Sequence, residues 1–457
     1  MALGPRLQLL LESLQKLLRR NAFNHAKRLL KRTRPVDVAV VMRFLNPSQQ
    51  HKVFELLPDD ESRAQTLSEA DANIRTTMLA ERPHEELLRL LQLMSADDQA
   101  DLLAGLPDEV RQQLIDALHP QEAAEVEELL HYGAETAGGI MSPDFFALPE
   151  ESTAAEAIQA LQSGNHELEM AFYIYVVNEP GHLMGVVSLR QLVVNPPTMT
   201  LADMMVTDVI SADVNADQEE VARLAARYNL LAIPVVEEGN RLVGIVTIDD
   251  VIDVLREEAT EDILKMAGAD ESVFQDHSLV RNFRIRAPWL FATWIGGICT
   301  SLLIGSFQHI LQAEVVLASF MPMILGMGGN VGTQTATITV RGLATGRVSH
   351  EHSLAYVLRE LGIGLMLGIL YGVLLASYAL VRHGTSGGAM LALPLTVGLS
   401  ILSSMTVAAL VGASTPLLFS RLNIDPAVAT GPIVTTFVDL LGSLVYFTVA
   451  TACLSSL

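Results

Sequence analysis

The sequence predicts a multidomain membrane protein: an all-α superhelical region, then a pair of small α/β modules, then an α-helical transmembrane bundle with five spans per subunit. The chain has 457 residues, which is too long for one ordinary domain. Its charge is divided unevenly, with about −25 in residues 1–280 and about +3 in residues 281–457. Long apolar segments follow residue 281, whereas short helical and strand patterns precede it.

Residues 1–137 are expected to form stacked short helices. Apolar residues recur at helical spacing, and the segments SQQHKVFELLPDD, DDQADLLAGLPDE and QEAAEVEELL form loose repeats. Such units bury their apolar faces only by stacking on their neighbours, so we expect a superhelix. Helix starts are indicated at Asn46-Pro47-Ser48, Ser95-Ala96-Asp97-Asp98 and His119-Pro120-Gln121.

Residues 138–255 contain an internal repeat of about 60 residues, which we divide into modules at 138–199 and 200–255. The first copy contains the β-rich runs FYIYVV and LMGVVSL, and the second contains LAIPVV and RLVGIVTI. Helical patterns lie between these runs, so each copy is predicted to be a small α/β module. The charged stretch at 256–280 is predicted to be a linker helix that leads to the membrane part.

Five apolar segments are long enough to cross a bilayer, at about 288–311, 315–340, 354–380, 391–418 and 427–454. Arginines flank these segments on alternate sides, and only Arg382 and His383 oppose the alternation. By the positive-inside rule, we expect a multi-pass protein of the cell (inner) membrane, surrounded by lipid. Its N-terminal domains are expected in the cytoplasm and its C-terminus outside.

The acidic balance of the first part argues against nucleic acid as a partner, because nucleic-acid binding needs basic patches. It fits a cationic partner, although solubility alone also explains an acidic surface. Cys299 and Cys453 both lie in apolar segments and form neither a disulfide framework nor a CxxC metal motif. No nucleophile–base pair stands out, so we do not expect an enzyme.

Asp439 is the acidic side chain that we expect at mid-membrane depth, where a carboxylate usually marks a binding site or a water-filled path. The alternative is an Asp that only joins helices through hydrogen bonds. Small residues in GMGGNVGTQ either line a path or serve helix packing. One carboxylate per subunit with many neutral oxygens suits a hard, hydrated cation such as Mg²⁺. The expected pore-lining residues besides Asp439 are Gly328, Gly329, Asn330, Thr435 and Thr436.

Acidic side chains also gather outside the membrane segments. Like charges repel unless cations lie between them, so divalent cations would join these surfaces if the surfaces meet. Solvated helix faces are the alternative for each group. Asp425, at the inner end of the last segment, either collects cations or only caps a helix. The groups are Asp250, Asp253 and Glu257; Asp97, Asp98 and Asp101; and Asp213, Asp217 and Glu219.

These features resemble the MgtE family of magnesium channels and transporters, and the paired modules resemble CBS domains. The resemblance covers nearly the whole chain and is carried by TAGGIM at 136–141, by MPMILGMGGNVGTQ and RGLATGRV, and by Asp439. It implies a homodimer with a pore between ten helices, and magnesium sensing by the cytosolic domains. It implies metal-binding roles for Asp439, Asp425, Asp250, Asp253, Glu258, Glu261, Asp262, Asp217, Glu219, Asp97 and Asp101.

The resemblance also implies ATP binding at the CBS pair, where Thr247 and Asp250 fit the motif. Gln191 stands where the first module would carry Asp, and Asn229 stands where related chains often carry Asp. We therefore expect a Mg²⁺-selective, channel-like importer that cytosolic Mg²⁺ closes by binding between the N-domain, CBS pair and linker helix. The alternatives are an ion-coupled secondary transporter of divalent cations and a membrane-anchored nucleotide sensor.

Overall fold

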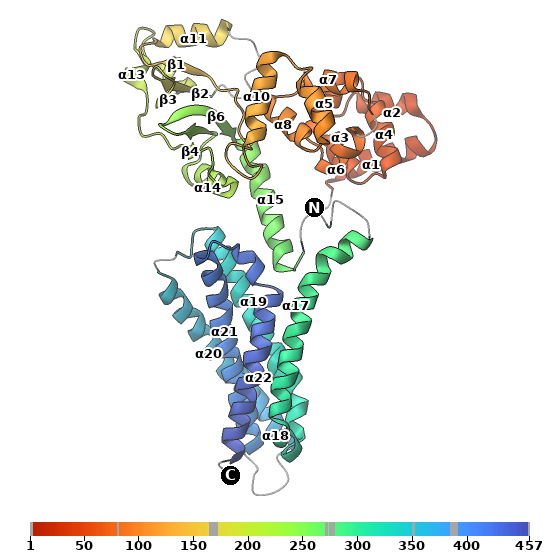
Figure 1. The fold of residues 1–457 in the computed structure, drawn as a ribbon, viewed down its shortest axis with the longest axis vertical. Helices are drawn as coiled ribbons and strands as arrows, with labels where there is room; N and C mark the ends of the chain where they lie inside the picture. Colours follow the sequence, from red (N-terminus) through yellow and green to blue (C-terminus); the bar gives the residue numbers. More distant parts are fainter. Residues whose placement is uncertain are drawn as a thin grey trace. The chain divides into compact units, whose positions relative to one another are not determined.

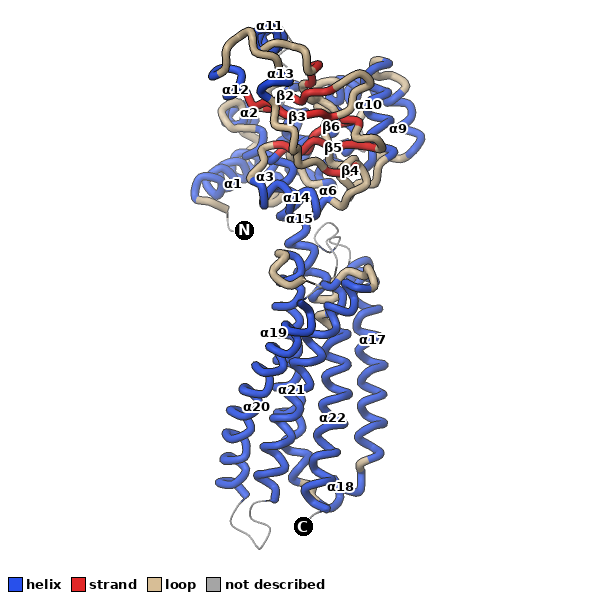
Figure 2. The backbone as a smooth tube through the Cα atoms, turned by 90° about the vertical axis from the view of Figure 1, so that its left-hand side faces the viewer, coloured by secondary structure: helices blue, strands red, loops and turns tan. Residues whose placement is uncertain are grey.

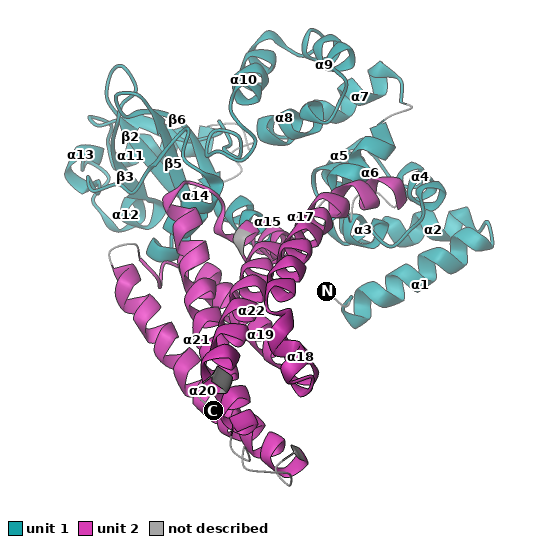
Figure 3. Cartoon of the chain, turned by 60° about the horizontal axis from the view of Figure 1, so that its bottom comes forward, with its two compact units in different colours: residues 1–256 teal, residues 257–457 magenta. Residues whose placement is uncertain are grey.

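The computed structural model describes residues 3–79, 82–163, 172–269, 273, 279–349, 352–383 and 392–455. The chain divides into two compact units, residues 1–256 and residues 257–457 (Figure 3). Each unit has hydrophobic core clusters of its own. The division falls inside one helix, α15 (Ile248–Met266).

The first unit begins with short helices packed on one another, in red and orange in Figure 1, as the sequence predicts. Their inward faces share one core, in which Leu14, Phe54 and Leu91 are fully buried. The helices are α1 (Pro5–Arg19), α2 (Phe23–Leu30), α3 (Pro35–Met42), α4 (Pro47–Glu55), α5 (Asp60–Ser68), α6 (Ala72–Leu79), α7 (His84–Leu91), α8 (Ala96–Ala104), α9 (Asp108–Ile115) and α10 (Pro120–His131).

The three predicted helix starts in this region are confirmed. Asn46 accepts a hydrogen bond from the Gln49 backbone N–H at 3.0 Å, and the Gln49 side chain accepts one from the Asn46 N–H. This capping box satisfies donors that the first turn of α4 leaves open. Ser95 and His119 precede α8 and α10 without a side-chain cap. A proline at the first position of α10 sets the helical backbone there instead.

Two three-stranded sheets follow, with strand orders β1-β2-β3 and β4-β5-β6 (Figure 2). In each sheet the first pair of strands is parallel and the second antiparallel, which matches the internal repeat. A bridge between His182 and Arg241 joins the two modules. The strands are β1 (Ala147–Pro149), β2 (Tyr173–Val177), β3 (Leu183–Ser188), β4 (Ala212–Asp213), β5 (Ala232–Glu237) and β6 (Arg241–Thr247). The helices are α11 (Ala154–Ser163), α12 (Leu189–Val194), α13 (Leu201–Met204) and α14 (Gln218–Tyr228).

The TAGGIM segment, residues 136–141, connects the helical region to the second module through backbone hydrogen bonds. The Gly138 N–H donates to the Val214 carbonyl at 2.8 Å. A Cβ at Gly139 would lie 2.2 Å from the Gly133 carbonyl oxygen, which is closer than atoms can approach. The motif therefore serves a close approach of two backbone segments.

The linker helix α15 corrects the prediction of a helix over 256–280. It begins at Ile248, directly after β6, and ends at Met266. It ends there because Gly268 has a φ of 69°, a left-handed conformation that favours glycine. The Gly268 and Ala269 N–H groups donate to the carbonyls of Lys265 and Leu264 at 3.0 and 2.9 Å, which closes the last turn. The acidic face thus belongs to a helix that continues the second module.

The second unit is a bundle of long apolar helices that run side by side (Figures 1 and 2). Five of them are long and apolar enough to cross a membrane, as predicted. The first begins at Leu279 rather than near 288, so Arg281, Arg284 and Arg286 lie within its first turns. The helices are α17 (Leu279–Ser306), α18 (Gln308–Ala313), α19 (Val316–Ala344), α20 (Ser353–His383), α21 (Ala392–Arg421), the 3₁₀ helix η2 (Pro426–Ala429) and α22 (Pro432–Ser455).

Helix α21 is at the centre of this bundle and packs against α19, α20 and α22. A Cβ at Gly412 of α21 would lie 2.4 Å from the Gly332 carbonyl oxygen of α19, so small residues bring these two helices together. Half of the apolar window of α21 is buried, but only 6% of that of α17. Within one chain, α17 therefore presents a large uncovered face.

Candidate functional site

Asp439 of α22 lies at the wall of a hollow of about 390 Å³ in the membrane unit. Helices α17 and α19 form the rest of the wall. No residue of α17 was predicted as part of the path, although CTSLL in the first apolar segment contains a pair of hydroxyl residues. The residues lining the hollow besides Asp439 are Gly297, Thr300, Ser301, Ile304 and Leu325.

The expected lining residues of α19 divide into two kinds. Asn330 is exposed and Gly329 is half-buried, and a Cβ at Gly329 would meet no other atom within 4 Å. Gly328, in contrast, is buried, and a Cβ there would lie 2.8 Å from Ser404 Oγ of α21. Its small size therefore serves the packing of α19 on α21, which was the alternative left open for these glycines.

The hydroxyls of Thr435 and Thr436 lie in the first turn of α22. Thr436 donates to the Pro432 carbonyl at 2.6 Å, and Thr435 donates to the Gly431 carbonyl at 3.1 Å. Each oxygen therefore keeps lone pairs that can accept further hydrogen bonds. The Thr436 side chain also fills the space at Gly296 of α17, where a Cβ would lie 2.1 Å from its methyl carbon. This contact sets the distance between the two helices on which the hollow depends.

Glu360 of α20 is a second acidic residue within a membrane segment. Glu360 was not among the residues predicted from the sequence, although it lies inside the predicted third segment. Its side chain is only 6% exposed. One turn earlier, the Tyr356 hydroxyl shares a 3.1 Å hydrogen bond with Thr339 of α19. Glu360 is not among the residues that line the hollow at Asp439.

Asp425 caps η2 and also binds the end of the linker helix. One carboxylate oxygen accepts from the Ala427 N–H at 2.8 Å, and the other lies 2.7 Å from Lys265 Nζ. Lys265 also pairs with Glu261, one turn earlier in α15, at 2.6 Å. Burial and the nearby charge of Asp425 raise the pKa of Asp262 above its usual range. The structure thus brings together three of the predicted metal ligands: Glu261, Asp262 and Asp425.

The first unit contains a second concentration of carboxylates, which we call the acidic cluster. Burial raises the pKa of Asp250 to about 7, and its neighbour Asp97 adds to the rise. Burial raises the pKa of Asp97 itself to about 6. Asp97 Oδ1 is buried and has no hydrogen-bond partner among the described residues. The cluster joins the end of α5, the start of α8 and the start of α15, and consists of Glu69, Asp97, Asp98, Asp249, Asp250 and Asp253.

Glu69 is a member of the acidic cluster that was not predicted from the sequence. Burial and the charges of Asp253, Asp98 and Asp249 raise its pKa. It follows α5 directly, separated from the other members by a long stretch of sequence. No spacing rule connects it to them, because only the folded chain brings these helices together.

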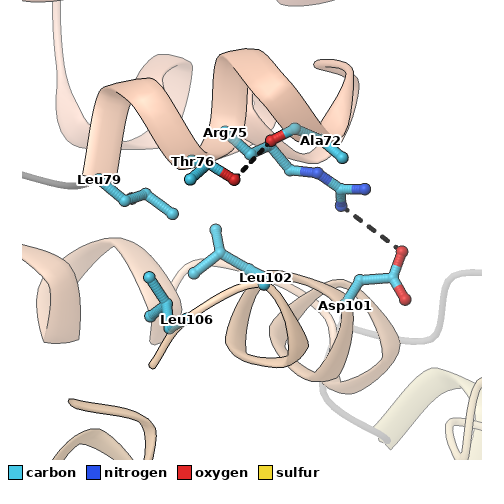
Figure 4. A pocket seen from close by; sticks show the side chains of 8 residues that line it. Ala72, Arg75, Thr76, Leu79, Asp101, Leu102 and Leu106 are labelled. Atoms are coloured by element: carbon cyan, nitrogen blue, oxygen red, sulfur yellow. Dashed lines mark hydrogen bonds and ion pairs between the residues drawn. The ribbon is translucent and has the colours of Figure 1, made fainter. Parts of the chain in front are cut away.

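Asp101, although predicted as a metal ligand, pairs with a basic side chain. Arg75 of α6 lies 3.5 Å from it across a small pocket of about 40 Å³ (Figure 4). Asp253 likewise pairs with Arg256, at 2.9 Å. Among the described residues, no three His, Cys, Asp or Glu side chains form a ready-made metal site. Asp101 and Asp253 therefore each have a basic partner already.

The remaining predicted residues lie on α14 and α15. Asp217 caps α14 by accepting from the Glu219 N–H at 2.8 Å. Asn229 ends the same helix in the left-handed conformation, with a φ of 53°, which suits Asn. Glu258 lies half-buried in the middle of α15.

The residues predicted to bind nucleotide also have partners within the chain. The Thr247 hydroxyl is buried and donates to Asp250. Gln191, in the first module, forms a capping box with Ser188. The two modules thus begin their last helices in a similar way, with Asp250 and Gln191 in equivalent places.

Three family profiles match the chain. One described as "MgtE intracellular N domain" matches residues 33–135, one described as "CBS domain" matches 137–195 and 201–257, and one described as "Divalent cation transporter" matches 321–449. Together they account for both units.

Relatives of similar length match over nearly the whole chain. The magnesium transporter MgtE of Thermus thermophilus is 38% identical over 96% of this chain and 97% of its own length. The magnesium transporter MgtE of Bacillus subtilis is 35% identical over 92% of this chain and 95% of its own. A solved structure, the cytosolic domain of the Mg²⁺ channel MgtE in complex with ATP, aligns with a TM-score of 0.50 at 38% identity. It covers 53% of this chain and 99% of that chain.

Proposed function

The chain belongs to the MgtE family of magnesium transporters, and we propose that it is a Mg²⁺-selective, channel-like importer that cytosolic Mg²⁺ closes. The observation that carries this proposal is the position of Asp439, a membrane-embedded carboxylate at the wall of a hollow. Hydroxyls of α17 share that wall. Mg²⁺ gives up its water reluctantly, so one carboxylate with neutral oxygens suits a hydrated ion.

A second copy of the chain would complete the path. The face of α17 is almost uncovered in one chain, and the hollow at Asp439 borders that helix. A homodimer related by a two-fold axis would set the same surfaces against each other. Two copies of Asp439 would then face one path, with the N-terminal domains in the cytoplasm and the C-terminus outside.

Gating follows from the two sets of carboxylates. In the acidic cluster, burial and mutual repulsion disfavour the ionised forms of Asp97 and Asp250. A divalent cation bound there would remove this repulsion and favour the packed arrangement of α5, α8 and α15. Mg²⁺ would thereby shift the population toward a closed state that binds it better. Glu258, Asp217 and Glu219 would add ligands on neighbouring surfaces.

Mg²⁺ flux into proteoliposomes tests the path. Asp439→Ala should abolish flux at equal protein load, whereas Glu314→Ala should leave it intact. Glu314 is an exposed carboxylate of the same unit that does not line the hollow. Equal flux in the parent and in Asp439→Ala would move the ion path elsewhere. Flux driven by an imposed pH gradient would favour an ion-coupled transporter.

ATP binding by the CBS pair is a second proposal, favoured by the likeness to a cytosolic domain solved with ATP. Thr247 and Asp250 would be the residues nearest the ribose. Titration of the full-length protein with ATP, beside Asp250→Asn, tests this. Equal affinity in both proteins would place the nucleotide elsewhere, and no binding would exclude it.

A further inference from the structure

Lys265 already occupies the space between two predicted metal ligands. Its ammonium group lies 2.6 Å from Glu261 Oε1 and 2.7 Å from Asp425 Oδ2. Glu261 belongs to the same helix, one turn earlier, whereas Asp425 begins the segment that leads into α22. The side chain of Lys265 is only 29% exposed. The contact therefore ties the last turn of the linker helix to the inner end of the membrane bundle.

The backbone around this contact is closely packed. A Cβ at Gly431 would lie 2.3 Å from the Met266 carbonyl oxygen, and one at Gly268 would lie 3.3 Å from the Trp289 side chain. Asp425 is held by its second oxygen, which caps η2. Both sides of the ion pair are thus fixed in position, so the ammonium group lies in a site of defined shape.

The charges around Lys265 are those of a cation site. The charges of Asp425, Lys265 and Arg341 also act on the carboxylate of Asp262, which follows Glu261 in α15. The ammonium group thus contacts two carboxylates, those of Glu261 and Asp425, and it acts electrostatically on a third, that of Asp262. An ammonium ion and Mg²⁺ both bind carboxylate oxygens, and they cannot occupy one position together.

We propose that Lys265 is a built-in competitor of Mg²⁺: it holds the linker helix on the membrane bundle when divalent cations are absent, and it sets the Mg²⁺ concentration needed to occupy Glu261 and Asp425. The proposal rests on the Mg²⁺-sensing role proposed above and adds the residue that tunes it. The ion pair stabilises the metal-free state, whereas the metal-bound state gains nothing from it. Removing the ammonium group therefore weakens the metal-free contact and strengthens Mg²⁺ binding.

The test compares full-length protein in lipid nanodiscs with Lys265→Met, Lys265→Arg and Lys52→Met. Lys52 is an exposed lysine of α4, so its loss changes the net charge equally at a remote place. Hydrogen exchange of the amides at the end of α15 is measured with chelator and across a Mg²⁺ titration. In chelator, Lys265→Met should exchange about five-fold faster, as expected for the loss of one partly buried ion pair. The Mg²⁺ concentration at which its exchange rate is half-way between the metal-free and metal-bound values should fall by a similar factor. Lys265→Arg should behave as the parent.

Each result decides the question. If Lys265→Met exchanges as the parent in chelator and has the same Mg²⁺ midpoint, the inference fails while the sensor stands. If the Mg²⁺ midpoint falls but exchange in the presence of chelator is unchanged, Lys265 acts only through its local charge. That result would overturn the proposal that its ion pair holds the linker helix on the membrane bundle. If no protein responds to Mg²⁺, the competition and the sensor fall together. Flux through Asp439 would then still report separately on the transport function.

Discussion

Asp97 and Asp250 are carboxylic acids whose pKa values burial raises to about 6 and about 7. Without divalent cations, the folded protein therefore holds protons near neutral pH that the unfolded chain has released. Their contribution to stability is complete below about pH 4 and is lost as the pH rises through 6 to 7. Bound Mg²⁺ should replace the protons and remove this dependence.

Thermal unfolding of the full-length protein in detergent checks this prediction. In chelator, the melting temperature of the parent should fall between pH 5 and pH 8, and Mg²⁺ should flatten the curve. The double variant Asp97→Asn/Asp250→Asn should lack the fall, because it has no carboxylates to ionise there. The same fall in the variant would show that other groups cause it.

A second prediction at the scale of one residue concerns Arg75 and the Mg²⁺ concentration that closes the flux. Its ion pair with Asp101, at 3.5 Å, is partly exposed and contributes less than about 1 kcal/mol. Arg75→Met should nevertheless lower the Mg²⁺ concentration that half-closes the flux, by up to about five-fold, because Asp101 loses its cation. Arg89→Met is the matched control, since Arg89 pairs with Asp60 at the same distance away from α8. Equal midpoints in both variants would show that Asp101 takes no part in sensing.

The residues predicted from the sequence are those whose type is unusual for their surroundings. A carboxylate in an apolar segment singled out Asp439 as a candidate, and the gathering of acidic residues singled out Asp97 and Asp250. Lys265 gave no such signal, because a lysine near the end of a helix is ordinary. The role proposed for Lys265 depends on its contact with Asp425, which lies more than a hundred residues later in the chain. Only the packing of α15 against η2 and α22 brings the two side chains together.

Helix α15 is the element that carries residues of both units without a break. Ala259 lies in its middle. Ala259→Pro removes one backbone hydrogen bond and should cost about 3 kcal/mol of helix stability. We expect the variant to keep Asp439-dependent flux and to lose its closure by Mg²⁺. Ala259→Ser, which keeps the backbone N–H, should retain closure. Normal Mg²⁺ closure in the proline variant would show that the helix does not transmit the signal.

At the scale of elements, periodicity predicted the short helices because burial on one face leaves a regular pattern, and length with apolar composition predicted the five membrane segments. The end of the linker was predicted wrongly. Its charged pattern continues past Met266, and only the backbone conformation of Gly268 shows where the helix stops. Likewise, the sequence showed that Gly328 is small, but not that it faces Ser404.

The whole molecule is expected to be a dimer because α17 is almost uncovered in one chain. Native mass spectrometry from lipid nanodiscs should give a species of twice the 49.5 kDa chain mass. Removing Mg²⁺ should leave this mass unchanged, since the contact between membrane helices does not depend on the cytosolic carboxylates. A monomer that transports Mg²⁺ would contradict the two-fold arrangement and place the path within one bundle.

The length of α15 has a mechanical consequence. Its 19 residues form a rod about 28 Å long. A tilt of only about 5° about its first turn would displace its last turn by about 2.5 Å for a rod of that length. That displacement is as large as the 2.7 Å separation between Lys265 and Asp425. A small change in the direction of α15 is therefore enough to make or break the ion pair at its last turn.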